Sequence, residues 1–185
     1  MKTNENIALY VLRLAGTLFL IAAVVAALLA GVNAVTAPVI AELNAAATQE
    51  AISAVLPGGF DSEITDYADA TGIVSKVYQG ANGYALEVGP GGFDNTITMM
   101  VGVDNEGKVL GISIVNHTET AGLGAVADAD TPKGIAFREQ FIGTSGSVSV
   151  TKDGGMMDAI TGATITSRAI CVGVNAALDC VAGLG

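Results

Sequence analysis

The sequence predicts an α+β fold in which a single N-terminal transmembrane helix precedes a domain with an antiparallel sheet and flanking helices. Two features predict it. A charge-free apolar run lies near the N-terminus, and from residue 61 onward short β-branched runs alternate with glycine-containing turns before a final amphipathic pattern. Strands linked as hairpins and accompanied by a few helices are typical of α+β domains.

The apolar run extends from Leu14 to Val32. As a helix rising about 1.5 Å per residue it covers roughly 28 Å, close to the thickness of a bilayer's hydrocarbon core. The alternative is a cleaved signal peptide, whose apolar region has about 7–15 residues. Small residues, Ala34 and Ala37, follow the run and leave cleavage open. Its length nevertheless favours an uncleaved transmembrane helix over residues 14–32.

The distribution of basic residues predicts how this helix is oriented. Lys2 and Arg13 precede it, and the next basic residue is Lys76. Because positively charged flanks stay in the cytoplasm, we expect residues 1–13 there and the remainder outside, in a single-pass protein of the cell's inner or plasma membrane. The net charge of −10 excludes nucleic acid as a favoured partner. It also disfavours surface binding to anionic lipid, so the membrane contact is assigned to the helix.

The elements beyond the membrane follow from periodicity and turn residues. Residues 33–57 contain Pro38 and then a helical apolar pattern, which predicts an extracytoplasmic helix. Residues 58–185 are expected to form the folded domain. Its predicted elements are two hairpins (73–78 with 84–88, and 96–103 with 109–115), a short helix (132–141), an edge strand (148–151) and a last helix (165–182) that stops at Gly183.

The two cysteines, Cys171 and Cys180, lie in the last predicted helix. Their spacing puts them on opposite faces and roughly 13 Å apart along the axis. A disulfide needs Cα atoms within about 7 Å, so none is expected. Two thiols and one histidine do not make a metal site, and burial as small apolar side chains is the favoured interpretation.

A hydroxyl-rich segment from Asp158 to Ser167 precedes the last helix. It contains Thr161, Thr164, Thr166 and Ser167, with the small residues Gly162 and Ala163 between them. Helix N-termini have unpaired N–H groups and a positive dipole end, so such a segment can bind phosphate. Ordinary helix capping by a hydroxyl explains the same residues, and the pattern alone leaves both interpretations open.

A second polar segment runs from His117 to Gly124, directly after a predicted strand. His117, Glu119 and Thr120 can form hydrogen bonds, while Gly122 and Gly124 allow another backbone or a ligand to approach closely. A solvated loop is the alternative, because isolated polar residues are common in loops.

The first segment resembles the flavinylation motif of the FMN-binding domain family, found in the RnfG subunit of the Rnf complex and in NqrC of the Na+-translocating NADH:quinone reductase. The family pattern is Asp-x-x-(Ser/Thr)-Gly-Ala-(Thr/Ser), and every fixed position matches from Asp158 to Thr164. In that family the last hydroxyl forms a phosphoester with FMN. The resemblance therefore implies covalent FMN on Thr164, attached outside the cytoplasm by a flavin transferase that uses FAD.

The second segment is similar to the family's His-x-Glu-Thr-Pro-Gly-Leu-Gly, which lines the flavin site, with Ala121 in place of proline. A third stretch, residues 133–141, resembles one that often carries tryptophan. Phe137 there is expected to pack in the core, with stacking on the flavin as the alternative. The cofactor-binding residues implied by the resemblance are Thr164, Asp158, Thr161, Gly162, Ala163, Ser167, His117, Glu119, Thr120, Gly122, Leu123 and Gly124.

The resemblance implies a membrane-anchored flavoprotein that relays electrons among the membrane and redox subunits of the ion-translocating Rnf complex, a ferredoxin:NAD+ oxidoreductase. No catalytic acid or base, metal site or NAD-binding motif is expected in the chain itself. The short length favours RnfG over NqrC. An NqrC-like subunit, a free-standing extracytoplasmic flavoprotein reductase and a cofactor-free assembly subunit stay open as alternatives.

Overall fold

The computed structural model describes residues 2–184, with side-chain surroundings defined from residue 9 onward. It divides into two compact units, Met1–Ala46 and Ala47–Gly185. The boundary between the two units lies inside the first helix.

Helix α1 runs without a break from Lys2 to Val55 and contains Pro38. The sequence predicts a membrane helix and a second helix after this proline, whereas the structure has one helix. Proline removes a single N–H donor, and the helix-favouring Ala, Leu and Glu residues around it allow the helix to continue. The division into a spanning part, 14–32, and an extracytoplasmic part, 33–57, stays a prediction.

The part of α1 in the first unit exposes apolar side chains on all sides. Leu12, Phe19, Leu20 and Val35 are among them, each at least 64% exposed. By length and composition, the described helix is able to cross a membrane. A helix that is apolar all round has no stable place in water, and a bilayer removes that cost. The last helix, α3 (Thr164–Leu184), passes the same test but is mostly buried in its own domain.

The second unit contains a five-stranded antiparallel sheet in sequence order, which confirms the predicted α+β class. The two expected hairpins are β2–β3 and β4–β5, whereas the short first strand is a feature that the sequence pattern missed. β1 has only three residues, all exposed or half-exposed, and pairs with β2 alone. The strands are β1 (Ser62–Ile64), β2 (Val74–Gly80), β3 (Gly83–Val88), β4 (Thr98–Asp104) and β5 (Val109–Asn116).

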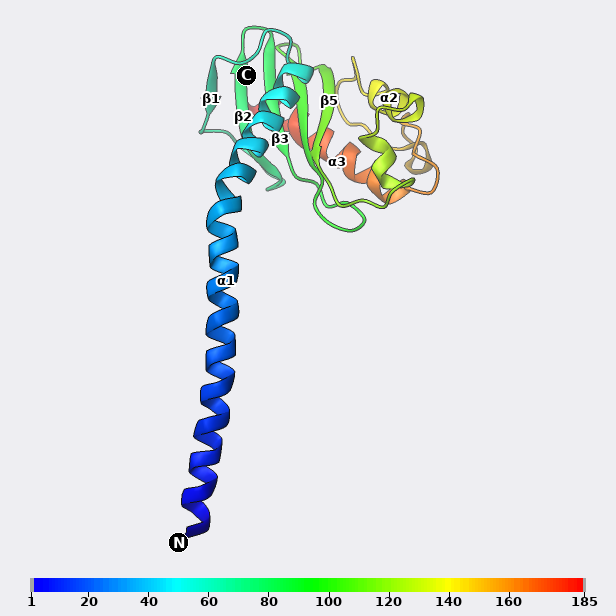
Figure 1. Cartoon of the computed structure of the whole chain (residues 1–185). Coiled ribbons are helices and arrows are strands. Elements are labelled where there is room, and N and C mark those ends of the chain that lie inside the picture. Colours follow the sequence, from blue (N-terminus) through cyan, green and yellow to red (C-terminus); the bar gives the residue numbers. More distant parts are fainter. Residues whose placement is uncertain (1, 185) are drawn as a thin grey trace. The chain divides into compact units, whose positions relative to one another are not determined.

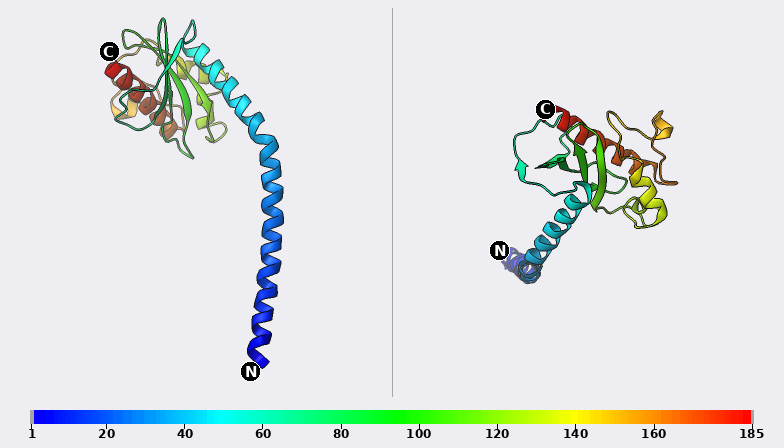
Figure 2. Two further views of the ribbon diagram at one scale, coloured as in Figure 1. Left: turned by 90° about the vertical axis from the view of Figure 1, so that its left-hand side faces the viewer. Right: turned by 90° about the horizontal axis from the view of Figure 1, so that it is seen from above.

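Both faces of the sheet are covered by helices (Figures 1 and 2). On one face α3 packs against alternate strand residues such as Leu86 and Val101. On the other face the last turns of α1 pack Ile52 and Val55 against Met100 and its neighbours. Side chains alternate between the two faces along β4, so one face of this strand packs against α3 and the other against α1.

Three predictions about local structure need correction or confirmation. No strand forms at 148–151, because the side-chain amide of Asn175 accepts from the Val148 N–H at 2.7 Å and donates to the Val148 carbonyl at 2.9 Å. That amide takes the place of a neighbouring strand. Gly183 does not stop the last helix, since α3 continues to Leu184. The short helix α2 (Pro132–Glu139) is confirmed, with Thr131 as its N-cap.

Both cysteines are free and buried, as predicted. Burial, reinforced by the charge of Asp153, raises the pKa of Cys171 to about 11, and burial also raises the pKa of Cys180. Because the thiolate is the reactive form, we expect a thiol reagent at pH 8 to label neither residue in the folded protein and both after denaturation. Mass spectrometry of the labelled chain measures this. Stoichiometric labelling before denaturation would contradict the packing of α3.

Candidate functional site

The two polar segments lie against each other at the N-terminal end of α3. The Thr166 hydroxyl donates to the Glu119 carboxylate at 2.5 Å, across 47 positions of sequence. The Leu123 side chain lies 3.0 Å from the point where a Cβ on Gly162 would stand. The hydroxyl-rich segment and the His117–Gly124 loop therefore form one site.

Glu119 is the buried centre of this contact. One carboxylate oxygen accepts from the N–H groups of Phe93, at 2.7 Å, and Asp94, at 3.4 Å, while the other accepts from Thr166. A Cβ on Gly92 or Gly124 would overlap a Glu119 oxygen, so a larger residue at either position would displace the carboxylate. A single carboxylate thus joins the 92–94 loop, its own loop and the first turn of α3. Such charge-assisted hydrogen bonds are the stronger kind in proteins.

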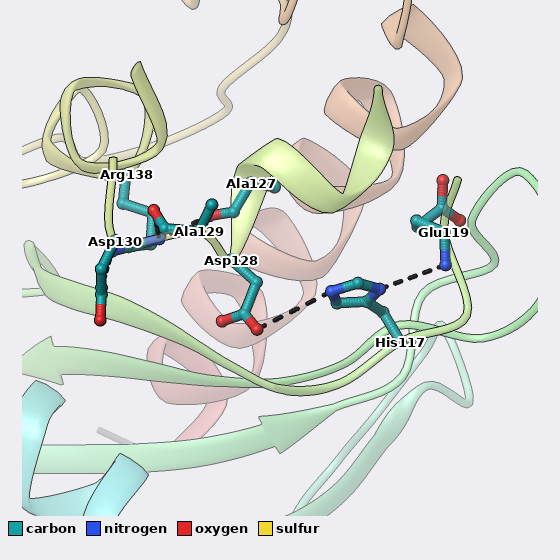
Figure 3. Close-up of polar contacts among 7 residues, drawn as sticks. All are labelled: His117, Glu119, Ala127, Asp128, Ala129, Asp130 and Arg138. Carbon is teal, nitrogen blue, oxygen red and sulfur yellow. Dashed lines mark hydrogen bonds and ion pairs between the residues drawn. The ribbon is translucent and has the colours of Figure 1, made fainter. Parts of the chain in front are cut away.

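His117 contacts the backbone of the His117–Gly124 loop (Figure 3). Its Nδ1 accepts from the Glu119 N–H at 3.2 Å, and its Nε2 lies 3.7 Å from the Asp128 carboxylate. One residue before Asp128, the Ala127 carbonyl accepts from Arg138 of α2 at 2.7 Å. Two pockets, described below, flank the contact between the two polar segments, and His117 lines neither of them. Its place in the structure is that of a residue that holds the loop.

The hydroxyl-rich segment separates into residues that face outward and residues that hold the backbone. Ser167 is fully buried and accepts from the Ile160 N–H at 3.0 Å while donating to the Ala163 carbonyl at 3.0 Å. The Gln140 side chain holds the Asp158 backbone by accepting from its N–H and donating to its carbonyl. Thr161 and Gly162 are exposed. Gly162 has a φ of +81°, a value that favours glycine and permits the turn into α3.

Thr164 is the first residue of α3, and its hydroxyl accepts from the Lys152 ammonium at 3.1 Å. Within residues 2–184 the first-turn N–H groups of Thr164, Ile165 and Thr166 have no hydrogen-bond acceptor, and the first bonded N–H is that of Ser167. None of the hydroxyls caps these groups within the described chain, so capping does not account for the segment.

Two pockets flank the contact between the segments. The smaller, about 270 Å³, opens onto Thr164. The larger, about 490 Å³, borders Asp158 and Thr161. The smaller pocket is lined by Phe93, Glu119, Thr120, Leu123, Gly124, Lys152, Gly162, Ala163, Thr164, Ile165 and Thr166. The larger is lined by Gly122, Val126, Lys133, Ala136, Phe137, Gln140, Asp158, Ala159, Ile160 and Thr161.

Several of these residues are not predicted by the sequence patterns. Phe93 and Lys152 come from loops that carry no motif, and Thr166 is only one hydroxyl of four in its segment. The single sequence signal is that Lys152 is among the few basic residues beyond the membrane helix of an acidic chain. Phe137 is buried and contacts Phe141 edge to face with ring centroids 5.5 Å apart, which confirms its core role beside the larger pocket.

The smaller pocket has the groups that a phosphate ester requires. The Thr164 hydroxyl, the Lys152 ammonium and unpaired helix N–H groups meet at one end, and the helix dipole adds positive potential there. Leu123, Ile165 and Phe93 keep substantial apolar surface exposed around the opening. An anionic group next to a planar apolar ring system fits this combination.

Comparisons with known proteins match both halves of the chain. The family described as the RnfG N-terminal region matches residues 2–55, and the FMN-binding domain family matches residues 92–179. The G subunit of the Na+-translocating ferredoxin:NAD+ oxidoreductase complex of Acetobacterium woodii is 34% identical, with 97% of each chain covered. The chain belongs to the RnfG family, the G subunits of ion-translocating oxidoreductase complexes.

Further members of the RnfG family are similar over most of their length. The protein of Methanosarcina acetivorans is 33% identical, with 89% of this chain and 91% of the relative covered. That of Pseudomonas aeruginosa is 34% identical, with 90% and 86% covered. The expectation of RnfG rather than NqrC is confirmed by these matches. This RnfG homologue is a membrane-anchored protein with an FMN-binding domain that includes both polar segments.

Proposed function

We propose that this chain is the flavoprotein subunit of an ion-translocating ferredoxin:NAD+ oxidoreductase complex, where it relays electrons through FMN bound covalently to Thr164. The names of its relatives support the complex, and the FMN-binding domain supports the cofactor. The observation that carries the attachment site is the Thr164 hydroxyl, which lies 3.1 Å from the Lys152 ammonium at the open N-terminus of α3. Its partners are the other membrane and redox subunits of that complex and the lipid around α1.

Attachment requires only a phosphoryl transfer to a hydroxyl. The Thr164 oxygen forms a bond to the FMN phosphorus as the pyrophosphate bond of FAD breaks, AMP leaves and the hydroxyl proton passes to solvent. A flavin transferase is the partner for this step. The chain contributes an oriented oxygen and positive potential for the phosphate.

Bound FMN supplies reversible one- and two-electron chemistry, while the chain supplies position and electrostatics. The first-turn N–H groups of α3 would hold the phosphate. Glu119 keeps the two loops together and so fixes the apolar walls at Leu123 and Ile165. None of these residues has to exchange a proton with a substrate, which suits a relay rather than a self-contained enzyme.

The arrangement across the membrane is also a proposal. Residues 1–13 are assigned to the cytoplasm, 14–32 to the bilayer, and 33–57 with 58–185 to the extracytoplasmic side. Lys2 and Arg13 support this orientation through the positive-inside bias. Attachment of an impermeant cysteine reagent at an engineered Ser62→Cys in intact cells tests it. Labelling only after the cells are broken would contradict an extracytoplasmic domain.

Intact mass under denaturing conditions tests the covalent attachment. The chain expressed with a flavin transferase should gain the mass of FMN less one water and fluoresce on a denaturing gel. The same chain without the transferase should do neither. An unchanged mass in both samples would overturn covalent attachment. The mass of the apoprotein also tests whether the N-terminal helix is retained.

A further inference from the structure

Lys152 adds a positive charge to the site and has no salt-bridge partner among the described residues. It lies in the short 3-10 turn η2 (Thr151–Asp153). Its ammonium donates to the Thr164 hydroxyl at 3.1 Å, and within the described part of the chain it forms no ion pair. The protein has a net charge of −10, so this unpaired lysine stands out against an acidic chain.

Lys152 adds its charge to an end of the pocket that is already positive in character. The N-terminus of α3 carries the positive end of the helix dipole, and a nearby cation is repelled there. The N–H groups of Thr164, Ile165 and Thr166, which have no acceptor within residues 2–184, add further positive character. The ammonium contacts the Thr164 oxygen, and the N–H groups and the dipole belong to the same end of the smaller pocket. A negative group attached at that oxygen would turn the repulsion into attraction.

An ion pair holds this loop in place. Arg168 lies one helical turn after Thr164 on α3, and its guanidinium donates two hydrogen bonds of 2.6 Å to the Asp153 carboxylate. Asp153 directly follows Lys152 in η2. A hydrogen bond from Arg168 lowers the pKa of Asp153, so the carboxylate is ionised at neutral pH. At the end of the turn, Gly155 packs so closely on the Ser149 carbonyl that a Cβ there would overlap it.

We propose that Lys152 orients the Thr164 hydroxyl for FMN attachment and then binds the attached phosphate, with the Asp153–Arg168 pair holding Lys152 in position. The inference rests on the proposed covalent FMN site. A hydroxyl oxygen has two lone pairs, so one accepts from Lys152 while the other stays free to bond phosphorus. The resulting phosphodiester carries one negative charge, which the single ammonium balances.

The experiment uses the full chain in detergent, as wild type and as Lys152→Gln, Lys152→Arg and Lys108→Gln. Lys108 is the matched control, because it is an exposed lysine in the β4–β5 turn paired with Glu106. Two quantities are measured: the rate of flavin incorporation by the transferase, from intact mass, and the Kd for free FMN without transferase, from quenching of flavin fluorescence. Thermal unfolding of each apoprotein shows that the fold is retained.

Lys152→Gln should slow incorporation about tenfold and raise the Kd for FMN about tenfold, as expected for the loss of one charge-assisted hydrogen bond. Lys152→Arg should restore most of both, and Lys108→Gln should change neither. Because Asp153 acts through Lys152, adding Asp153→Asn to Lys152→Gln should cause little further loss.

The outcomes separate this inference from the proposed function. If the wild type takes up no flavin from the transferase, covalent attachment fails, and so does the inference that depends on it. If the wild type is loaded at Thr164 but Lys152→Gln has the same rate and the same Kd, the role of Lys152 alone is overturned. A slower rate with an unchanged Kd would overturn the binding of the phosphate by Lys152, since the lysine would then act only on the attachment step.

Discussion

The substitution Thr164→Ala should abolish covalent flavin attachment while leaving the domain folded. The bond needs the Thr164 oxygen, since Ser167 is fully buried and the Thr166 hydroxyl donates to Glu119. Thr161 is exposed, but it lines the larger pocket and not the pocket that contains Lys152. Alanine is a good helix former at the first position of α3, so the change in stability should stay within about 0.5 kcal/mol. Flavin fluorescence on a denaturing gel and intact mass measure the result.

Two variants serve as controls for Thr164→Ala. Thr164→Ser keeps the hydroxyl and should retain attachment. Thr65→Ala removes an exposed threonine hydroxyl far along the chain, after β1, and should have no effect. Full fluorescence in Thr164→Ala would move the attachment site to another residue, and the position of Lys152 would then have no link to the phosphate.

The second large effect is expected for Glu119→Ala. This change leaves the Phe93 N–H and the Thr166 hydroxyl without their acceptor in a buried place. Hydrogen bonds to charged groups contribute about 1.5–3 kcal/mol each, so we expect a loss of about 2–4 kcal/mol in the free energy of unfolding. Flavin loading should fall strongly as well, because the loop that carries Leu123 and Gly124 loses its link to α3.

Denaturant unfolding of the full chain, followed by circular dichroism, measures the loss in Glu119→Ala. Glu119→Gln is the conservative variant: its carbonyl oxygen still accepts from Phe93, and its amide donates to a reoriented Thr166 hydroxyl, so the loss should be about 1 kcal/mol. Glu106→Ala, at an exposed turn, should leave unfolding unchanged. Equal stability of Glu119→Ala and wild type would contradict the central role of this carboxylate.

Sequence patterns predicted the parts of the site that are local. The periodicity of the last helix predicted its start at residue 165, one position from the observed Thr164, because 3.6-residue repeats and the preceding Gly–Ala pair are properties of neighbouring residues. The two long hairpins were predicted for the same reason, through turn residues between alternating strands. The three-residue β1 has too few residues to show an alternation and was missed.

What the sequence determined by itself is an apolar N-terminal helix, an antiparallel sheet, a final helix and a hydroxyl at its start, since each depends on spacing within one segment. Only the tertiary structure decided which residues surround that hydroxyl. Lys152 reaches Thr164 because the Asp153–Arg168 pair folds a loop back onto α3, and Glu119 reaches Thr166 across 47 positions. Such contacts arise when the sheet and α3 pack around one core, and no local spacing encodes them.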